Sequence, residues 1–286
     1  MTLAVAVPFP WPEYLNAIPG SVVRAATLIP GFRFQPAVIM AADSRWTYRT
    51  GIDYDDGGIK VAYLGSHALG MYAGNTRAGQ LALGRLRHGI ERRQAGRQRR
   101  PVDPRSVLRA VWKQCSHLGG TLQFCFAFFD ANGNHHVFRF DSTEDFAPIE
   151  MDGVVTLGWS DECDFFRRRL NEELRARLSE ERMQTHGISF SFEEWAIMAG
   201  ILVREACEAQ ASGTVGGRPL IAVLTPAGVE GRSIHAADTR QDNPKFEQLT
   251  LTEEQIDKFY ERQRQRGLPY TKRRSPKAPS SVSANS

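Results

Sequence analysis

Short apolar runs broken by turn residues dominate the first part of the chain. Residues 2–7 and 37–42 are almost entirely apolar, and the second run ends in the polar cluster Asp43-Ser44-Arg45. Runs of this length, bounded by Pro, Gly and Asp, are typical of strands that are buried on both faces. The same kind of pattern predicts further strands at 22–29, 60–64, 68–72, 122–129, 136–140, 154–157 and 220–224.

Longer segments with apolar residues every three or four positions predict helices. These segments span about 76–93, 104–117, 161–183, 192–210 and 253–264. Asn132-Gly133 between two apolar runs predicts a β-hairpin. Strands and helices come in groups rather than in strict alternation, so the expected fold class is α+β. We expect two stacked antiparallel sheets with a helix pair on each outer face.

The composition fits one globular domain followed by a basic tail. Of the 286 residues, 42% are hydrophobic and 24% are charged, which suits a sizeable core. Residues 266–286 hold Pro, Ser, Lys and Arg with almost nothing apolar, and we expect them to be disordered. We therefore assign residues 1–250 to a domain with an insertion at about 8–36, and residues 251–286 to a short helix and tail.

Several function classes receive no support. No apolar run approaches the roughly 18 residues of a membrane-spanning helix, and the apolar start has no basic region, so a cytoplasmic protein without membrane contact is expected. The four cysteines form no CxxC pair, and nucleotide-binding and zinc-protease motifs are absent, so we expect no metal or organic cofactor. The Arg-rich stretches at 85–105 and 262–274 are interpreted as solvated, because few aromatic residues are interleaved with them. We therefore do not expect nucleic acid as a partner.

Three local features carry potential chemistry. Lys60 lies in an apolar context and needs a partner, which Asp43 at the end of a predicted strand can supply. Gly74 leads from a strand into a helix, where it allows close backbone approach and leaves N–H groups that can bind an oxyanion. Considered alone, a structural ion pair and a tight turn explain these residues more simply.

The segment from Ala37 to Gly74 resembles the strand-and-turn signature of proteasome β-type subunits. The match covers Ala37-Val-Ile-Met-Ala-Ala-Asp43-Ser-Arg45-x-Thr47, then Lys60, then Ala68-Leu69-Gly70-x-x-Ala73-Gly74. The step of fourteen residues from Lys60 to Gly74 matches the family, while the step from Asp43 to Lys60 is one residue longer. Weaker similarity extends over roughly residues 2–235. The resemblance implies the N-terminal-nucleophile (Ntn) hydrolase fold, a four-layer αββα sandwich.

The resemblance also implies a threonine-type endopeptidase. Removal of the initiator methionine would expose Thr2 as nucleophile, with its own α-amine as general base. Lys60 would keep the local field positive, Asp43 would orient Lys60 and the amine, and the Gly74 N–H would receive the oxyanion. Ser160 lies near a serine that active family members add, and it is equally explained as a helix N-cap.

Substrate and partners follow from the same resemblance. The backbone around Thr47 would hold an extended peptide, and Tyr72 and Thr76 would help line the pocket for the residue before the scissile bond. The implied substrate is a peptide or an unfolded protein. The implied assembly is a homo-oligomer, as a ring or a helical array, which an unfoldase or regulator could serve.

Departures from the family leave alternatives open. Nearly thirty residues separate Val7 from Ala37, where the family has a tight turn. Thr27 lies sixteen residues before Asp43, which is the family spacing, so it is a rival nucleophile. No aspartate precedes Gly216-Gly217, where active members carry one. The open alternatives are a non-catalytic scaffold or partner-binding subunit, and an Ntn amidase of a small molecule.

Overall fold

The computed structural model describes most of the chain in two antiparallel sheets and the helices around them. The described residues are 3–11, 14, 16, 36–47, 54–55, 58–96, 101–177, 192–209, 219–228, 249–250 and 253–265. The expected strand at 22–29, the rival nucleophile Thr27 and the tail at 266–286 lie outside them, as does the Gly216-Gly217 pair.

The first sheet has five strands in the order β10-β1-β2-β11-β12, and every neighbouring pair is antiparallel. Its strands are β1 (Leu3–Phe9), β2 (Ala37–Ala42), β10 (Val155–Gly158), β11 (Leu220–Leu224) and β12 (Leu249–Thr250). The strands β1 and β2 are buried on both faces, which explains why their sequences are apolar without alternation.

The second sheet is a meander in the order β5-β6-β7-β8-β9, again antiparallel throughout. Its strands are β5 (Val61–Gly65), β6 (Ala68–Gly74), β7 (Leu122–Phe129), β8 (His135–Asp141) and β9 (Ile149–Glu150). The Asn132-Gly133 hairpin joins β7 to β8, as predicted, and Gly133 has a φ of 81°. A separate two-stranded ladder pairs β3 (Trp46–Thr47) with β4 (Tyr54–Asp55).

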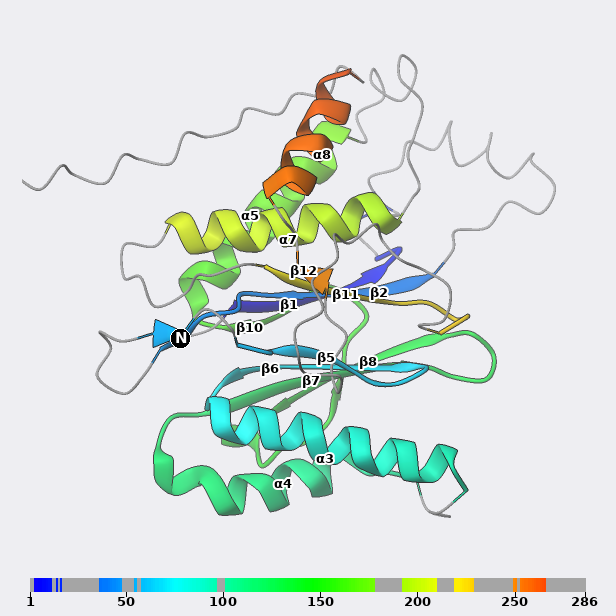
Figure 1. Cartoon of the computed structure of the whole chain (residues 1–286), viewed down its shortest axis with the longest axis vertical. Helices are drawn as coiled ribbons and strands as arrows, with labels where there is room; N and C mark the ends of the chain where they lie inside the picture. The colour runs from blue at the N-terminus through cyan, green and yellow to red at the C-terminus, as the bar shows by residue number, and fades with distance from the viewer. Residues whose placement is uncertain are drawn as a thin grey trace, which may run out of the picture.

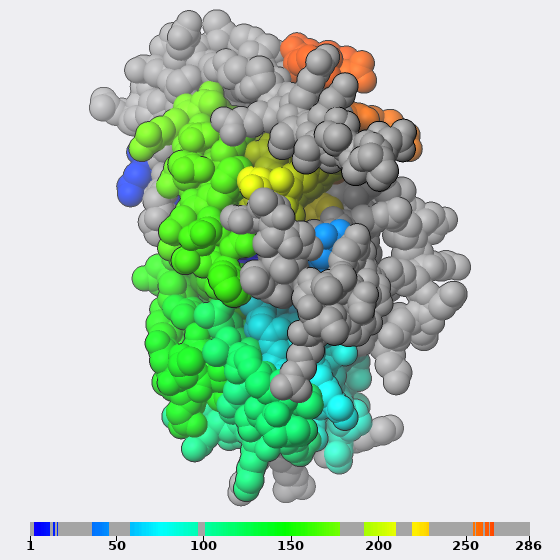
Figure 2. Space-filling view, turned by 90° about the vertical axis from the view of Figure 1, so that its left-hand side faces the viewer, coloured from blue at the N-terminus to red at the C-terminus, as the bar shows by residue number. Residues whose placement is uncertain are grey.

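Helices cover the outer faces of both sheets (Figure 1). The first sheet carries α5 (Ser160–Arg177), α7 (Phe192–Ala209) and α8 (Glu253–Gln265), and the second carries α3 (Thr76–Gln94) and α4 (Pro104–Cys115). Short 3-10 turns follow α4 and β8 at Ser116–Leu118 and Ser142–Glu144. Figure 2 shows the two helical layers at opposite ends of the molecule, with α3 and α4 at one end and α8 at the other.

Three hydrophobic clusters fill the spaces between these layers. Alternate residues of β1 separate onto its two faces, because side chains along a strand point in opposite directions. Val5 and Val7 pack toward α7, whereas Ala4 and Ala6 face the second sheet. The third cluster lies between the second sheet and the helices α3 and α4. The α+β class with two antiparallel sheets flanked by helices is therefore confirmed.

The helices α3 and α4 each begin after a residue whose side chain caps the first turn. The side chain of Asn75 accepts a hydrogen bond from the Ala78 N–H and caps α3. Asp103 caps α4 in the same way, and Pro104 occupies the first turn, where its missing N–H costs nothing. These caps explain why both helices have well-defined first residues.

Two further observations bear on the sequence-based division of the chain. The helix α8 lies beyond residue 250, yet Ile256 and Phe259 are buried in the same cluster as β1. It therefore packs onto the domain that the sequence assigned to residues 1–250. Among the described residues, no helix is both long enough and apolar enough to span a bilayer.

Candidate functional site

Asp43 ties the start of β1 to the end of β2. The Asp43 N–H donates to the Leu3 carbonyl at 3.0 Å, and the Leu3 N–H donates to Asp43 Oδ1 at 2.8 Å. The β1–β2 register, which pairs Ala4 with Ala42, places the two residues side by side. Only 1% of Asp43 is exposed, so these bonds form away from bulk water.

Lys60 completes the cluster from the segment before β5. Its Nζ donates to Asp43 Oδ2 at 2.7 Å, and both side chains are fully buried. Nζ also donates to the carbonyl of Arg45, whose own N–H donates to Asp43 Oδ2 at 3.2 Å. A buried ion pair needs such extra hydrogen bonds, because removing two charges from water costs several kcal/mol per ion.

Gly74 stands at the end of β6 in a conformation that few other residues adopt. Its φ is 93°, and a Cβ atom here would lie 2.1 Å from the carbonyl oxygen of Thr121. The next residue, Asn75, donates its N–H to that same oxygen at 2.7 Å. Glycine is therefore required by the close approach of β6 to the segment that enters β7.

The backbone brings Gly74 toward the Asp43 turn. The Tyr72 N–H donates to the Lys60 carbonyl at 3.1 Å, so β6 runs alongside the segment before β5. In the same segment, the Gly58 N–H donates to the Ser44 carbonyl at 2.8 Å. These two backbone hydrogen bonds tie the segment before β5 to the residue after Asp43 on one side and to β6 on the other.

The end of β10 lies beside the start of β1. The register pairs Leu3, the first residue of β1, with Gly158, the last residue of β10. Ser160 is the first residue of α5, is exposed, and places its Oγ 3.3 Å from the carboxylate of Asp161. Trp159, immediately before it, is 56% exposed.

No protein-family model matches the chain, and no curated protein matches its sequence at a significant level.

Other predicted site residues are distributed as follows. Thr2 lies outside the described residues, directly before Leu3. Thr47 belongs to β3 and pairs with Tyr54 of β4. Thr76 is the first residue of α3 and is partly exposed.

Tyr72 occupies a different place from the one expected. It is completely buried in the cluster beneath α3, because β6 alternates and its neighbours Met71 and Ala73 take the face toward the first sheet. A Cβ atom on Gly79 of α3 would lie 2.1 Å from its ring. The side chain is therefore part of the helix-facing core, and this position does not support a role in lining a substrate pocket.

Glu162 and Ser44 are buried polar residues that the sequence did not single out. Glu162, in the first turn of α5, is 3% exposed, and Ser44 is 2% exposed. Within the described ranges, Glu162 Oε2 and Ser44 Oγ have no hydrogen-bond partner. A buried carboxylate near the start of a helix leaves no sequence signal, because Asp and Glu are common in first turns for electrostatic reasons alone.

A second polar chain runs behind the site from β10 to β8. The Gly158 N–H donates to Gln123 Oε1 at 2.8 Å, and Gln123 Nε2 donates to Asp141 Oδ2 at 3.0 Å. Asp141 also accepts from the Thr143 N–H, and these hydrogen bonds lower its pKa although burial acts in the opposite direction. Gln123 pairs with Ala73, next to Gly74. This network fixes the ends of β6 and β10 relative to each other.

Cysteine chemistry receives little support. All four cysteines are free and buried. Burial raises the pKa of the Cys207 thiol well above its ordinary value, and the nearby charge of Asp43 acts in the same direction. A neutral thiol is a poor nucleophile, so Cys207 is a packing residue beside the Asp43–Lys60 pair.

Proposed function

We propose that the chain is a proteasome-like Ntn hydrolase that cleaves peptide bonds with Thr2 as its N-terminal nucleophile. The observation that carries this proposal is the double use of the Asp43 carboxylate. One oxygen holds the N–H of Leu3, and the other holds the ammonium group of Lys60. Thr2 is bonded to the Leu3 nitrogen, so the proposal assigns the nucleophile to the position directly before Leu3.

The proposed reaction needs no group beyond the chain and water. Thr2 Oγ attacks the scissile carbonyl while the Thr2 α-amine takes the hydroxyl proton. The tetrahedral intermediate collapses, the C–N bond breaks, and the leaving amine receives that proton. Water then attacks the resulting ester, the amine again takes a proton, and Oγ regains it as the product acid leaves.

The charges around the nucleophile suit this sequence of steps. An α-amine has a pKa of about 7.7–8.0, so a substantial fraction is neutral near physiological pH. Lys60 supplies a positive charge that stabilises anionic oxygen during attack, and Asp43 keeps that charge in place. On this proposal the Gly74 N–H, at the end of β6, receives the oxyanion. The missing side chain of Gly74 makes room for the Thr121 carbonyl oxygen.

The architecture agrees with the Ntn interpretation. The proposed nucleophile would precede β1, a central strand of the first sheet, and the supporting residues come from the ends of β2 and β6. The two sheets stack between helical layers, as in an αββα sandwich (Figure 1). On this proposal the substrate is an extended peptide or unfolded protein, and a closed homo-oligomer with an unfoldase or regulator would limit access.

One observation favours a non-catalytic subunit of the same fold. Asp43 and Lys60 are so completely buried that a purely structural ion pair would look the same. In that case the chain would serve as a scaffold or bind a partner, and Thr2 would carry no reactivity. An Ntn amidase of a small molecule would retain the reactive Thr2 and lack the enclosing oligomer.

The deciding experiment is the intact mass of the untagged protein, before and after incubation with a peptide epoxyketone. We expect loss of the initiator methionine and a single adduct that maps to Thr2. Thr2→Ala should abolish the adduct, and Thr27→Ala is the matched control that should retain it. A retained methionine without any adduct contradicts the proposal and favours the non-catalytic scaffold. A chain that starts at Thr27 would instead identify Thr27 as the nucleophile.

A further inference from the structure

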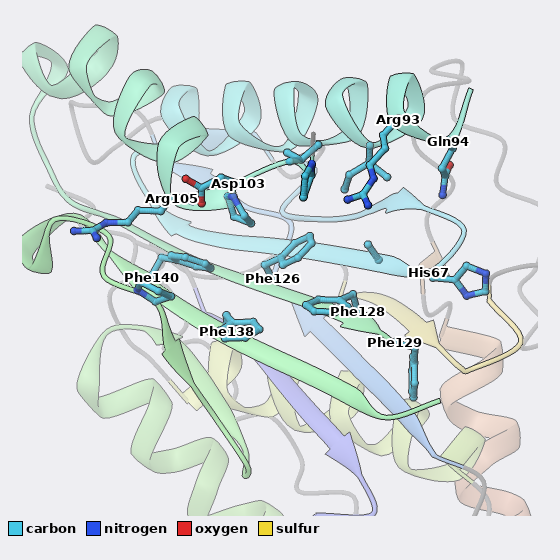
Figure 3. Close-up of a pocket in the computed structure, with 16 residues that line it drawn as sticks. His67, Arg93, Gln94, Asp103, Arg105, Phe126, Phe128, Phe129, Phe138 and Phe140 are labelled. Atoms are coloured by element: carbon cyan, nitrogen blue, oxygen red, sulfur yellow. Dashed lines mark hydrogen bonds between the residues drawn. The ribbon is translucent and has the colours of Figure 1, made fainter. Parts of the chain in front are cut away.

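A large cavity lies on the face of the second sheet opposite the Asp43–Lys60 pair. Its volume is about 720 Å³, and it opens between the hairpin β7–β8, the end of α3 and the loop before α4 (Figure 3). Small-molecule sites in proteins have volumes of roughly 300–1,000 Å³. The cavity is therefore large enough for an organic ligand, and nothing in the proposed peptide hydrolysis uses it.

The floor of the cavity is aromatic. Phe126, Phe128 and Phe138 project from the helix-facing side of β7 and β8 and are only half-buried. The rings of Phe128 and Phe138 lie nearly parallel, with centroids 6.2 Å apart, and Phe126 lies 5.6 Å from Phe128. The helices α3 and α4 leave this end of the sheet incompletely covered, so apolar ring surface faces the cavity.

The guanidinium of Arg93 contributes a positive charge at the rim of the cavity. Arg93 and Gln94, at the end of α3, point toward the strands that carry the phenylalanines (Figure 3). Within the described part of the chain, no hydrogen bond or ion pair engages the guanidinium of Arg93. Arg105, the other arginine of the rim, is already bound to Asp145 through two hydrogen bonds of 3.0 and 3.2 Å.

The carboxylate of Asp103 disfavours a ligand that carries two negative charges. Asp103 also lines the cavity, and its carboxylate caps α4 by accepting from the N–H groups of Arg105 and Ser106. A dianionic phosphate would meet this carboxylate, whereas a carboxylate can pair with Arg93 through a bidentate hydrogen bond. A mostly apolar cavity with an exposed cation at its rim suits an amphipathic ligand.

We infer that this cavity is a binding site for a small amphipathic carboxylate. The apolar body, an aryl ring or an alkyl chain, packs on Phe126, Phe128 and Phe138, and the carboxylate pairs with Arg93. Because the cavity and the Asp43–Lys60 pair lie on opposite faces of the second sheet, binding here is independent of the proposed hydrolysis. The inference therefore stands or fails separately from the proposed function.

The first test measures binding of 4-phenylbutyrate and its neutral amide to the full chain by ligand-observed NMR titration. For the acid, Arg93→Gln should weaken binding about tenfold, as expected for the loss of one charge-assisted hydrogen-bonding partner. Arg92→Gln is the matched control, because this neighbouring arginine is exposed like Arg93 but does not line the cavity, and its loss makes the same change in net charge. The amide should bind both variants and the natural chain equally.

A second variant tests the aromatic floor. Phe128→Ala should weaken both the acid and the amide, provided that its circular dichroism and cooperative melting show a folded protein. Equal affinity of the acid for the Arg93 and Arg92 variants overturns the role of Arg93. No saturable binding of either ligand, or unchanged binding to a folded Phe128→Ala protein, overturns the site itself.

Discussion

At the scale of single residues, the fully buried pair of Asp43 and Lys60 makes the strongest demand on the fold. Each charge is tolerated because the other neutralises it and because backbone groups complete its hydrogen bonds. Lys60→Met removes one charge and leaves the other in the protein interior. Such a change destabilises proteins by about 3–5 kcal/mol, far more than a surface substitution does.

We expect Lys60→Met to unfold at a lower concentration of guanidinium chloride. We also expect this variant to lose its reaction with the epoxyketone. Lys113→Met is the control, because Lys113 is exposed on α4 and its change should stay within about 0.5 kcal/mol. A Lys60→Met protein with unchanged stability would contradict a stabilising role for the buried ion pair.

At the scale of elements, two of the three glycines in α3 have opposite roles. A Cβ atom on Gly79 would lie 2.1 Å from the rigid ring of Tyr72, whereas a Cβ atom on Gly84 would meet nothing within 4 Å. Gly79→Ala should therefore destabilise the protein by about 1–3 kcal/mol through overpacking. Gly84→Ala should stabilise it by about 0.5–1 kcal/mol, because alanine loses less conformational freedom in a helix. Thermal melting of the two variants checks the opposite signs, and a gain at Gly79 would contradict the packing of α3 on β6.

The hairpin β7–β8 and its neighbour β9 share a pH-sensitive contact. His136 Nδ1 lies 2.7 Å from Glu150 Oε1, and this hydrogen bond is the main cause of the raised pKa of His136. A histidine whose pKa is raised on folding stabilises the native state at pH values below its unfolded pKa of about 6.5, and this contribution is lost as the pH rises through the folded value.

Glu150→Gln should therefore lower the melting temperature more at pH 5.5 than at pH 8.5. Glu144→Gln, an exposed carboxylate in the turn after β8, is the control and should show no such dependence. An equal loss at both pH values would show that the charge of His136 is not involved.

The sequence predicted the elements best where the pattern is local. The apolar stripe of α3 and the Asn132-Gly133 turn lie within a few residues of the groups they organise, and both elements form as expected. The two-residue strands β9 and β12 were missed, because pairing with β8 and β11, rather than their own sequence, defines them. The end of the helix predicted at 161–183 is described only to Arg177.

At the scale of the whole molecule, the site depends on contacts that no local pattern can reveal. The resemblance to proteasome subunits pointed to Asp43 and Lys60, and the structure brings them into contact. The bond from Leu3 to Asp43 follows from the β1–β2 register, and the chain from Gly158 through Gln123 to Asp141 joins strands of both sheets. Gln123 could not be predicted, because its hydrogen bonds join strands of separate sheets.

The topology also has a consequence for the order in which the protein folds during synthesis. The second sheet and its two helices are contained within residues 61–150, so they can form as soon as that segment is made. The first sheet instead pairs Leu3 with Gly158 and Ala42 with Leu220. Contacts between such distant residues form slowly, and strands with unpaired edges associate with other chains. β1 and β2 leave the ribosome first, yet β1 gains its second neighbour only with β10 and β2 only with β11. We therefore expect a chaperone to be needed at β1 and β2.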